Sequence, residues 1–221
     1  MTGSDPTTAP PAARVQSHSR VYLDFTHLGR HVTGIERVTI EQFEKVSFPG
    51  ADVRPVRARG IVSMILRQQL LIPLLALLHP SARFIFPGFP PSPLMRLFAR
   101  DRTVLYVHDL FLITRRQDLG RKARLYMAWP FAVAVRGLKH FLTNSEKTRR
   151  ELAVVAPADA HIALYRPQVA NVFALDADAA RRTVDPATLR IVSLGTVEPR
   201  KNYAAATAIL DALTQRGITD V

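Results

Sequence analysis

Two adjacent cations, Arg200 and Lys201, stand in a turn between an apolar run and a helical pattern. The apolar run at 189–194 predicts a buried strand, and apolar residues at helical spacing predict a helix over 203–215. Because a helix N-terminus already carries partial positive charge, two further cations are favourable there only when an anion binds. Arg offers a planar fork for phosphate oxygens, and Lys offers a point charge. The turn therefore predicts a phosphate site, with a solvated basic turn, partly neutralised by Glu198, as the alternative.

A histidine–aspartate pair, His108 and Asp109, follows a run of β-branched and aromatic residues at 103–107. That run predicts a central strand. In open α/β sheets, ligands bind outside the carboxyl ends of the strands. The pair is therefore placed where it could hydrogen-bond a sugar hydroxyl or a leaving phosphate. The alternative is an aspartate that caps the next element, beside a histidine that packs in the core.

A glycine-containing loop joins the predicted first strand, residues 20–25, to a predicted helix over residues 34–46. Thr33 and Glu36 have the spacing of a capping box, which marks the helix start and puts Gly34 at the tip of the turn. A glycine at such a tip lets backbone N–H groups approach a phosphate. The loop lacks the G-x-G-x-x-G pattern of dinucleotide-binding proteins, and a simple capped helix is the alternative.

Three strings, in this order, resemble the GT-B glycosyltransferases of family 4. They are T-G-I-E-R at 33–37, V-H-D-L at 107–110 and G-T-V-E-P-R-K-N at 195–202. The resemblance covers roughly residues 20–221, and the third string is the most specific of the three. Their common order and spacing lead us to identify the chain as similar to this family.

The resemblance implies a role for each of the residues singled out above. Arg200 and Lys201 would hold the diphosphate of the donor, and Gly34 would lie close to the donor phosphates and the acceptor. His108 would contact the donor sugar or the acceptor. We therefore expect His108 as the catalytic residue, with Gly34, Arg200 and Lys201 as substrate-binding residues and no metal ligand.

The resemblance also implies an activity. It is the retaining transfer of a sugar from a nucleotide-diphosphate sugar to a glycan or lipid-linked acceptor, in cell-surface polysaccharide synthesis. The donor is a substrate, and the family implies no cofactor and no obligatory metal. Asp176 and Asp178 match the D-x-D motif of metal-dependent glycosyltransferases, but they follow no predicted strand, so we expect no metal there. The expected location is the cytoplasm, with peripheral binding at the inner face of the membrane.

Strands alternate with helices along the chain, which predicts an α/β fold with a mostly parallel sheet and helices on both faces. By resemblance this is the GT-B arrangement: one complete Rossmann-like domain and the first β-α unit of a second. We expect a disordered lead at 1–19, an N-terminal acceptor-side domain at 20–170, a linker at 171–188 and the start of the nucleotide-sugar-binding domain at 189–221. The family's second domain continues well beyond such a unit, so we expect a truncated chain that is inactive alone.

Two segments of the first domain carry prolines. Residues 51–56 predict a strand that Pro55 restricts to an edge or a terminus. Residues 61–78 predict a helix with a kink at Pro73. The apolar second half of this helix suits either the core or a membrane surface, and we favour the core. The longest apolar run, 70–78, is shorter than the about 20 residues that span a bilayer.

Three further helices have boundary signals. Residues 120–137 predict a long helix that Pro130 should bend. Residues 144–146 predict the capped start of a helix that runs to about Val155. Asn202 is the predicted N-cap of the helix over 203–215.

The chain is strongly basic, with a formal net charge of +12 over 221 residues. Residues 100–151 carry twelve Lys and Arg against five Asp and Glu, a local excess of seven positive charges. Such a surface suits nucleic acid, an anionic membrane face or a charged lipid-linked substrate. A non-catalytic protein that binds nucleic acid or an anionic membrane is the alternative function. Because RNP-type strings, zinc ligands and a basic helix–turn–helix pattern do not occur, we expect no nucleic-acid partner.

Overall fold

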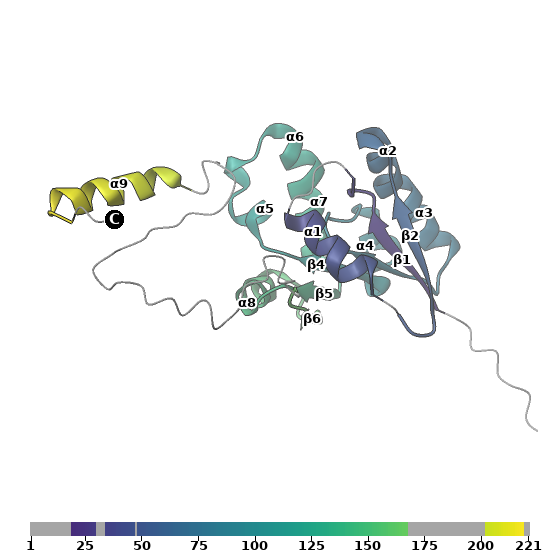
Figure 1. Cartoon of the computed structure of the whole chain (residues 1–221). Coiled ribbons are helices and arrows are strands. Elements are labelled where there is room, and N and C mark those ends of the chain that lie inside the picture. The colour runs from purple at the N-terminus through teal and green to yellow at the C-terminus, as the bar shows by residue number, and fades with distance from the viewer. Residues whose placement is uncertain (1–18, 30–33, 47, 168–201, 219–221) are drawn as a thin grey trace, which may run out of the picture. The chain divides into compact units, whose positions relative to one another are not determined.

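The computed structural model describes residues 19–29, 34–46, 48–167 and 202–218. The chain divides into two compact units, residues 1–168 and 169–221. In the first unit, six parallel strands form one sheet flanked by helices (Figure 1). The predicted α/β class and the parallel sheet are confirmed. Of the second unit, the structure describes one helix, α9, with the residues that flank it.

The six strands follow the sequence prediction closely. They are β1 (Ser19–Phe25), β2 (Ala51–Arg57), β3 (Arg83–Phe86), β4 (Thr103–Val107), β5 (His140–Thr143) and β6 (His161–Leu164). The helical segments include several π-helical and 3₁₀ stretches, which are labelled η. They are α1 (Gly34–Thr39), η1 (Ile40–Glu44), α2 (Gly60–Leu66), η2 (Arg67–Leu71), α3 (Ile72–Leu78), α4 (Leu94–Phe98), η3 (Arg100–Arg102), α5 (Phe111–Thr114), η4 (Arg116–Asp118), α6 (Arg121–Ala123), η5 (Arg124–Ala128), α7 (Trp129–Val135), α8 (Glu146–Val155) and α9 (Tyr203–Gln215).

The strand order is β2-β1-β3-β4-β5-β6. β2 lies at an edge, as Pro55 predicts, and β4 lies inside the sheet, as its β-branched and aromatic composition predicts. After β1 the chain forms β2 next to one edge of β1, and it then crosses over to form β3 next to the other edge. The carboxyl ends of β1 and β3 therefore flank a topological switch point, which is where open α/β sheets bind ligands.

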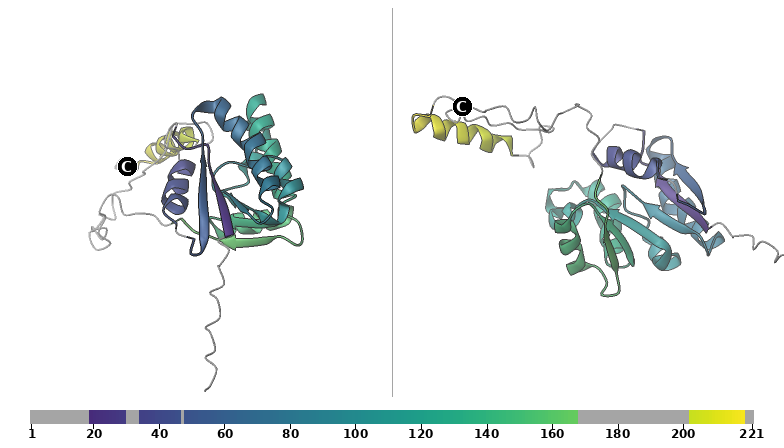
Figure 2. Two further views of the ribbon diagram at one scale, coloured as in Figure 1. Left: turned by 90° about the vertical axis from the view of Figure 1, so that its right-hand side faces the viewer. Right: turned by 60° about the horizontal axis from the view of Figure 1, so that its bottom comes forward.

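Alternate residues of the strands belong to two separate cores, one on each face of the sheet. On one face, Tyr22 and Leu105 pack with residues of α3, α4, α7 and α8. On the other, Leu23 and Tyr106 pack with Phe43 of η1. The two further views in Figure 2 show the same division, with α1 opposite the blue and teal helices. The prediction of helices on both faces is confirmed, although the larger core lies on the side of α3 and α7.

The helix over residues 60–78 corrects one expectation. Its inner side is in the core, where Ile72 and Ala76 are each 1% exposed. Its outer side is apolar too, yet it faces solvent. The preference for a core position is therefore right for one side of the helix and wrong for the other. Among the described residues, this is the one helix whose length and mean hydropathy of 1.9 would suit a membrane span.

Both prolines expected to disturb long helices follow a π-helical turn. Ile72 N–H donates to Arg67 O just before Pro73, and Trp129 N–H donates to Arg124 O just before Pro130. A proline has no N–H to donate, and the wider turn interrupts the regular ladder before it. Residues 60–78 and 121–135 nevertheless remain helical throughout.

The cap predictions had different outcomes at the two later helices. The Ser145 side chain accepts a hydrogen bond from Thr148 N at 3.2 Å, which confirms the capped start of α8. Asn202 precedes α9 but has a left-handed backbone, with φ of 50°, and its side chain makes no capping bond. The prediction of a side-chain cap at Asn202 is therefore wrong. Its carbonyl oxygen instead accepts from Ala205 N at 2.9 Å.

Candidate functional site

Two histidines and a glycine lie just after the carboxyl ends of three neighbouring strands. His27 follows β1, Gly88 follows β3 and His108 follows β4. The close contact between Gly88 and the His27 ring, and the electrostatic effect of His108 on His27, show that these residues form one cluster. The cluster lies at the switch point of the sheet, where the fold alone predicts a ligand site.

His108 is held in one tautomer by its hydrogen bond. Its Nε2 lies 2.9 Å from the carbonyl oxygen of Pro87, which can only accept, so Nε2 carries the proton. Burial lowers the pKa of His108, against smaller opposing effects of the Pro87 carbonyl and Asp109. The neutral imidazole then has Nδ1 as a hydrogen-bond acceptor. The edge of its ring packs against Tyr106, with centroids 4.6 Å apart.

Asp109 caps the element that follows it. Its Oδ1 accepts a hydrogen bond from Phe111 N at 3.0 Å, at the start of α5. Of the two interpretations left open, the aspartate takes the capping role. His108 is partly buried, and its Nδ1 has no hydrogen-bond partner among the described residues, so its role as a site residue stays a prediction.

His27 is a second histidine in the cluster, and it is 3% exposed. Thr39 Oγ1 donates its proton to Ile35 O at 2.9 Å, so it must accept from His27 Nε2, which lies 3.3 Å away. This leaves His27 Nδ1 as an acceptor, and it is one of two buried side-chain polar atoms without a partner in the described part of the chain. A buried acceptor of this kind is costly unless something donates to it.

The charge state of His27 follows from its surroundings. Burial is the main cause that lowers the pKa of His27 to about 4, and nearby His108 lowers it further. Glu36, itself 7% exposed in the first turn of α1, acts in the opposite direction. At neutral pH, His27 and His108 are therefore both neutral, and each has an Nδ1 lone pair that can accept a hydrogen bond.

Gly88 is required by the position of His27. A Cβ atom at residue 88 would lie 2.4 Å from His27 Nε2, which is closer than any real contact of this kind. On its other side, the His27 ring contacts Phe89 in a tilted arrangement, with centroids 5.2 Å apart. The loop after β3 thus fixes the orientation of the His27 imidazole.

Gly34 begins α1 and is exposed. A Cβ at residue 34 would meet no atom within 4 Å, and its φ is not in the left-handed region. Nothing within the described chain therefore requires glycine here. The open space in front of its backbone is compatible with the close approach of a ligand, as the sequence predicts. Thr33, the partner of Glu36 in the predicted capping box, lies outside the described residues.

Three arginines surround an open pocket next to this cluster. Arg57 ends β2, Arg59 precedes α2 and Arg67 begins η2, and the pocket they line with Phe25 has a volume of about 680 Å³. Arg57 is paired with Glu44. Arg59 and Arg67 have no acidic partner within the part of the chain that the structure describes. The pocket is therefore suited to an anion.

Several predicted site residues lie outside the described residues. These are Arg200, Lys201, the preceding strand at 189–194, and the aspartates of the D-x-D string, Asp176 and Asp178. The diphosphate site and its relation to His108 stay predictions. Among the described residues, no group of three or more His, Cys, Asp or Glu side chains could hold a metal ion.

Sequence reasoning identified His108 but missed His27 and Gly88. The rule that pointed to His108, a histidine just after a predicted strand, applies equally to His27, two residues after Phe25. Gly88 gave no comparable signal, because its role depends on a ring from a different loop. Comparison of the chain with protein-family models, with curated proteins and with solved structures gave no match.

Proposed function

We propose that the chain belongs to a GT-B glycosyltransferase that transfers a sugar from a nucleotide-diphosphate donor to a hydroxyl of its acceptor. The support comes from two sources. The three family-like strings occur in order along the chain, and two of them surround the histidine cluster at the switch point. In this proposal the first unit is the acceptor-side domain, and the helix α9 follows the donor's diphosphate site.

The observation that carries the proposal is the Nδ1 acceptor of His108, at the switch point of the sheet. Sugars and sugar acceptors present hydroxyl groups, which need acceptors with fixed direction. His108 has its Nε2 proton committed to Pro87 O, and His27 has its Nε2 proton committed to Thr39. The Nδ1 of His108 can therefore receive an O–H from a ligand, whereas the Nδ1 of His27 is enclosed within the protein. The His108 ring cannot release a proton to that hydroxyl without changing tautomer.

The reaction balances without a further reactant. The bond between sugar C1 and the oxygen of the leaving diphosphate breaks, and a bond forms between C1 and the acceptor oxygen. The acceptor proton passes to the departing diphosphate. Arg200 and Lys201 would neutralise the negative charge that develops on that group, and His108 would orient the donor sugar or the acceptor.

The arginine pocket supports an acceptor that carries negative charge. It adjoins the carboxyl edge of the sheet, and Arg59 and Arg67 are available to bind an anion. A lipid-linked glycan precursor joins its sugars to phosphate, so it has the hydroxyl and the anion that this edge would bind. The substrate class is therefore proposed as a glycan on a phosphate-bearing carrier.

Calorimetric titration with nucleoside diphosphates tests the donor site. In a protein that carries this chain with a whole second domain, Arg200→Ala and Lys201→Ala should each weaken binding by about 10- to 150-fold, because each removes a charge-assisted contact of about 1.5–3 kcal/mol. Arg216→Ala, at the C-terminal end of α9, is the matched control and should bind normally. Unchanged affinity in both Arg200→Ala and Lys201→Ala would remove the donor site from the proposal.

A further inference from the structure

An exposed stripe of apolar side chains runs along the helix over residues 60–78. We define this leucine stripe by five residues at successive i, i+4 positions: Val62, Leu66, Leu70, Leu74 and Leu78. Residues at this spacing form one continuous row along a helix. The exposed fractions of these residues are 71%, 52%, 60%, 50% and 62%, in that order. The row is about 24 Å long, at 1.5 Å per residue.

The other side of the same helix is anchored to the sheet. Ile72, Pro73 and Ala76 are buried there, and Gln68 Nε2 donates to Asp24 Oδ2 at 2.8 Å. Asp24 is itself fully inside the protein, where burial raises its pKa. A helix that crossed a bilayer would have to leave this core and carry Gln68 into lipid. The stripe is therefore an outer face of a docked helix.

The segment of chain that contains the leucine stripe carries charge of one sign, although Arg54, Arg57 and Arg100 pair with acidic residues outside it. Residues 53–100 contain seven Arg and no Asp, Glu or Lys. Arg67 lies within the helix and Arg59 just before it, and neither has an acidic partner in the described part of the chain. An apolar row bordered by cations is the pattern of helices that lie at the interface of an anionic membrane.

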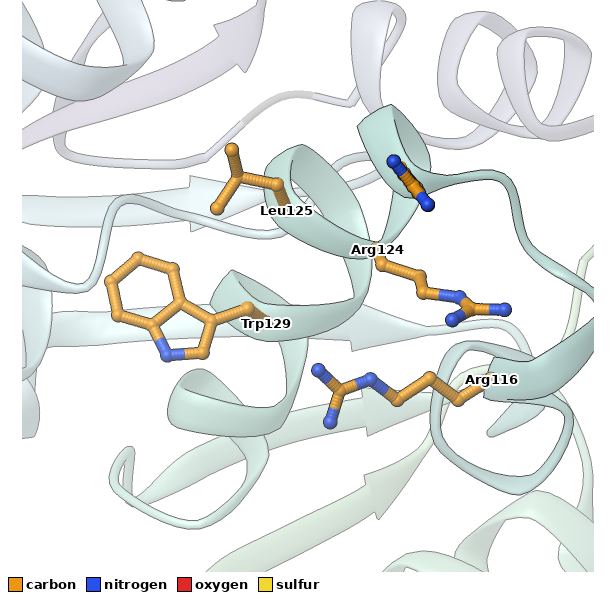
Figure 3. Close-up of a pocket in the computed structure, with 5 residues that line it drawn as sticks. Arg116, Arg124, Leu125 and Trp129 are labelled. Carbon is orange, nitrogen blue, oxygen red and sulfur yellow. The ribbon is translucent and has the colours of Figure 1, made fainter.

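A second exposed surface lies on the same face of the sheet as the helix over residues 60–78. It too combines apolar or aromatic side chains with arginines. Arg116, Arg121 and Arg124 line a pocket with Leu125 and Trp129 (Figure 3). Trp129 is 51% exposed, and its neighbour Tyr126 is 54% exposed. Phe131 and Ala134 of α7 pack into the same core as Ile72 and Ala76 of α3, so both surfaces belong to one face. Exposed Trp and Tyr side chains beside Arg are typical of protein surfaces that contact the lipid head groups of a membrane.

We infer that this face docks on a phospholipid bilayer with anionic head groups. The leucine stripe enters the boundary between head groups and acyl chains, and the arginines contact lipid phosphates. A second copy of the chain is a poorer occupant, because its own basic border would repel this one. The inference does not depend on sugar transfer, and it holds for a chain with no transferase activity.

Co-sedimentation with vesicles is the direct experiment. Vesicles with about one third phosphatidylglycerol in phosphatidylcholine should bind the chain at 150 mM salt, and vesicles of phosphatidylcholine alone should bind it far more weakly. Equal binding to both vesicles would overturn the role of the arginines. Failure to bind either would overturn the inference as a whole.

Two double variants test the two parts of the surface. Leu70→Gln with Leu74→Gln should lower the partition coefficient at least tenfold, since each buries roughly half a leucine side chain. Arg59→Gln with Arg67→Gln should lower it roughly 30-fold. Ile35→Gln and Arg37→Gln, both on α1 on the opposite face of the sheet, replace exposed residues outside this surface and are the matched controls. If the control variants lowered the partition coefficient as much as the double variants do, the assigned surface would be wrong.

The single tryptophan provides a measurement that needs no substitution. Brominated lipids in the vesicles should quench the fluorescence of Trp129, because the docked face places its ring at the head-group level. Binding without quenching would show that another face docks. Dimerisation that the leucine substitutions abolish would identify a second copy as the occupant, and resistance to alkaline carbonate extraction would identify a spanning helix. Each of these three results would overturn the inference.

Discussion

His108 Nε2 donates a hydrogen bond to Pro87 O at 2.9 Å, which joins the end of β4 to the loop after β3. The same loop continues into Gly88, which lies against the ring of His27. Thr148 Oγ1 of α8 lies 3.2 Å from the carbonyl oxygen of His108, so the main chain is tied from the other side too. The loop after β3 thus contacts both imidazoles, and α8 holds the main chain of His108.

The first prediction concerns the stability of the fold as a function of pH. The pKa of His27 is about 4 in the folded chain and about 6.5 in the unfolded chain. The unfolded state therefore binds the proton first, and the stability is complete above pH 6.5 and falls as the pH is lowered towards 4. The loss should be about 3 kcal/mol from this one group.

Urea unfolding at a series of pH values measures this loss. His27→Gln should show a smaller decrease of unfolding free energy between pH 6.5 and 4 than the natural chain. His161→Gln, at the exposed start of β6, is the control and should keep the decrease. A His27→Gln chain with the full decrease would show that other groups cause it.

The second prediction concerns the fit between Gly88 and His27. Gly88→Ala places a methyl group where the His27 ring now lies, so the ring or the loop must move. Overpacking of this kind costs about 1–3 kcal/mol of folding free energy. Thermal unfolding should show the loss. Gly34→Ala, where the added methyl meets open space, is the matched control and should unfold close to the natural temperature.

Gly34→Ala also provides the third prediction, now for ligand binding. The substitution should leave the fold intact but put a methyl group where the backbone would approach the donor phosphates. In the same two-domain protein as is used to test Arg200 and Lys201, calorimetry should show about tenfold weaker binding of a nucleoside diphosphate. Natural affinity in a folded Gly34→Ala protein would mean that the loop before α1 does not contact the ligand.

Much of the first unit could be predicted from the sequence because its signals are local. The run at 103–107 is β-branched and aromatic, and it forms an inner strand. Pro55 cannot donate to a neighbouring strand, and β2 is at the edge. Ser145 caps α8 with its own side chain. In each case the deciding residue acts on its immediate neighbours along the chain.

The candidate site could be predicted only in part, because its remaining features depend on contacts between distant segments. Gly88 matters through a ring that is 61 positions away in the sequence. The apolar second half of the helix over residues 60–78 is uniform in sequence, so the pattern does not tell which leucines face the core. Asn202 has the residue type of a cap, yet its left-handed backbone turns its side chain from that role.

The most direct test of the central claim is sugar transfer by a protein that carries this chain together with a whole second domain. The assay follows labelled sugar from a panel of nucleotide-diphosphate sugars into extracted lipid-linked glycans. The account predicts transfer by this two-domain protein. It predicts a loss of about 10- to 150-fold in His108→Ala, because a hydroxyl of the donor or acceptor loses its acceptor atom in the step where charge develops. The unfolding temperature of the variant should change little by comparison. A folded His108→Ala protein that transfers sugar at the unsubstituted rate, or an unsubstituted two-domain protein that transfers none from any donor, would contradict the account.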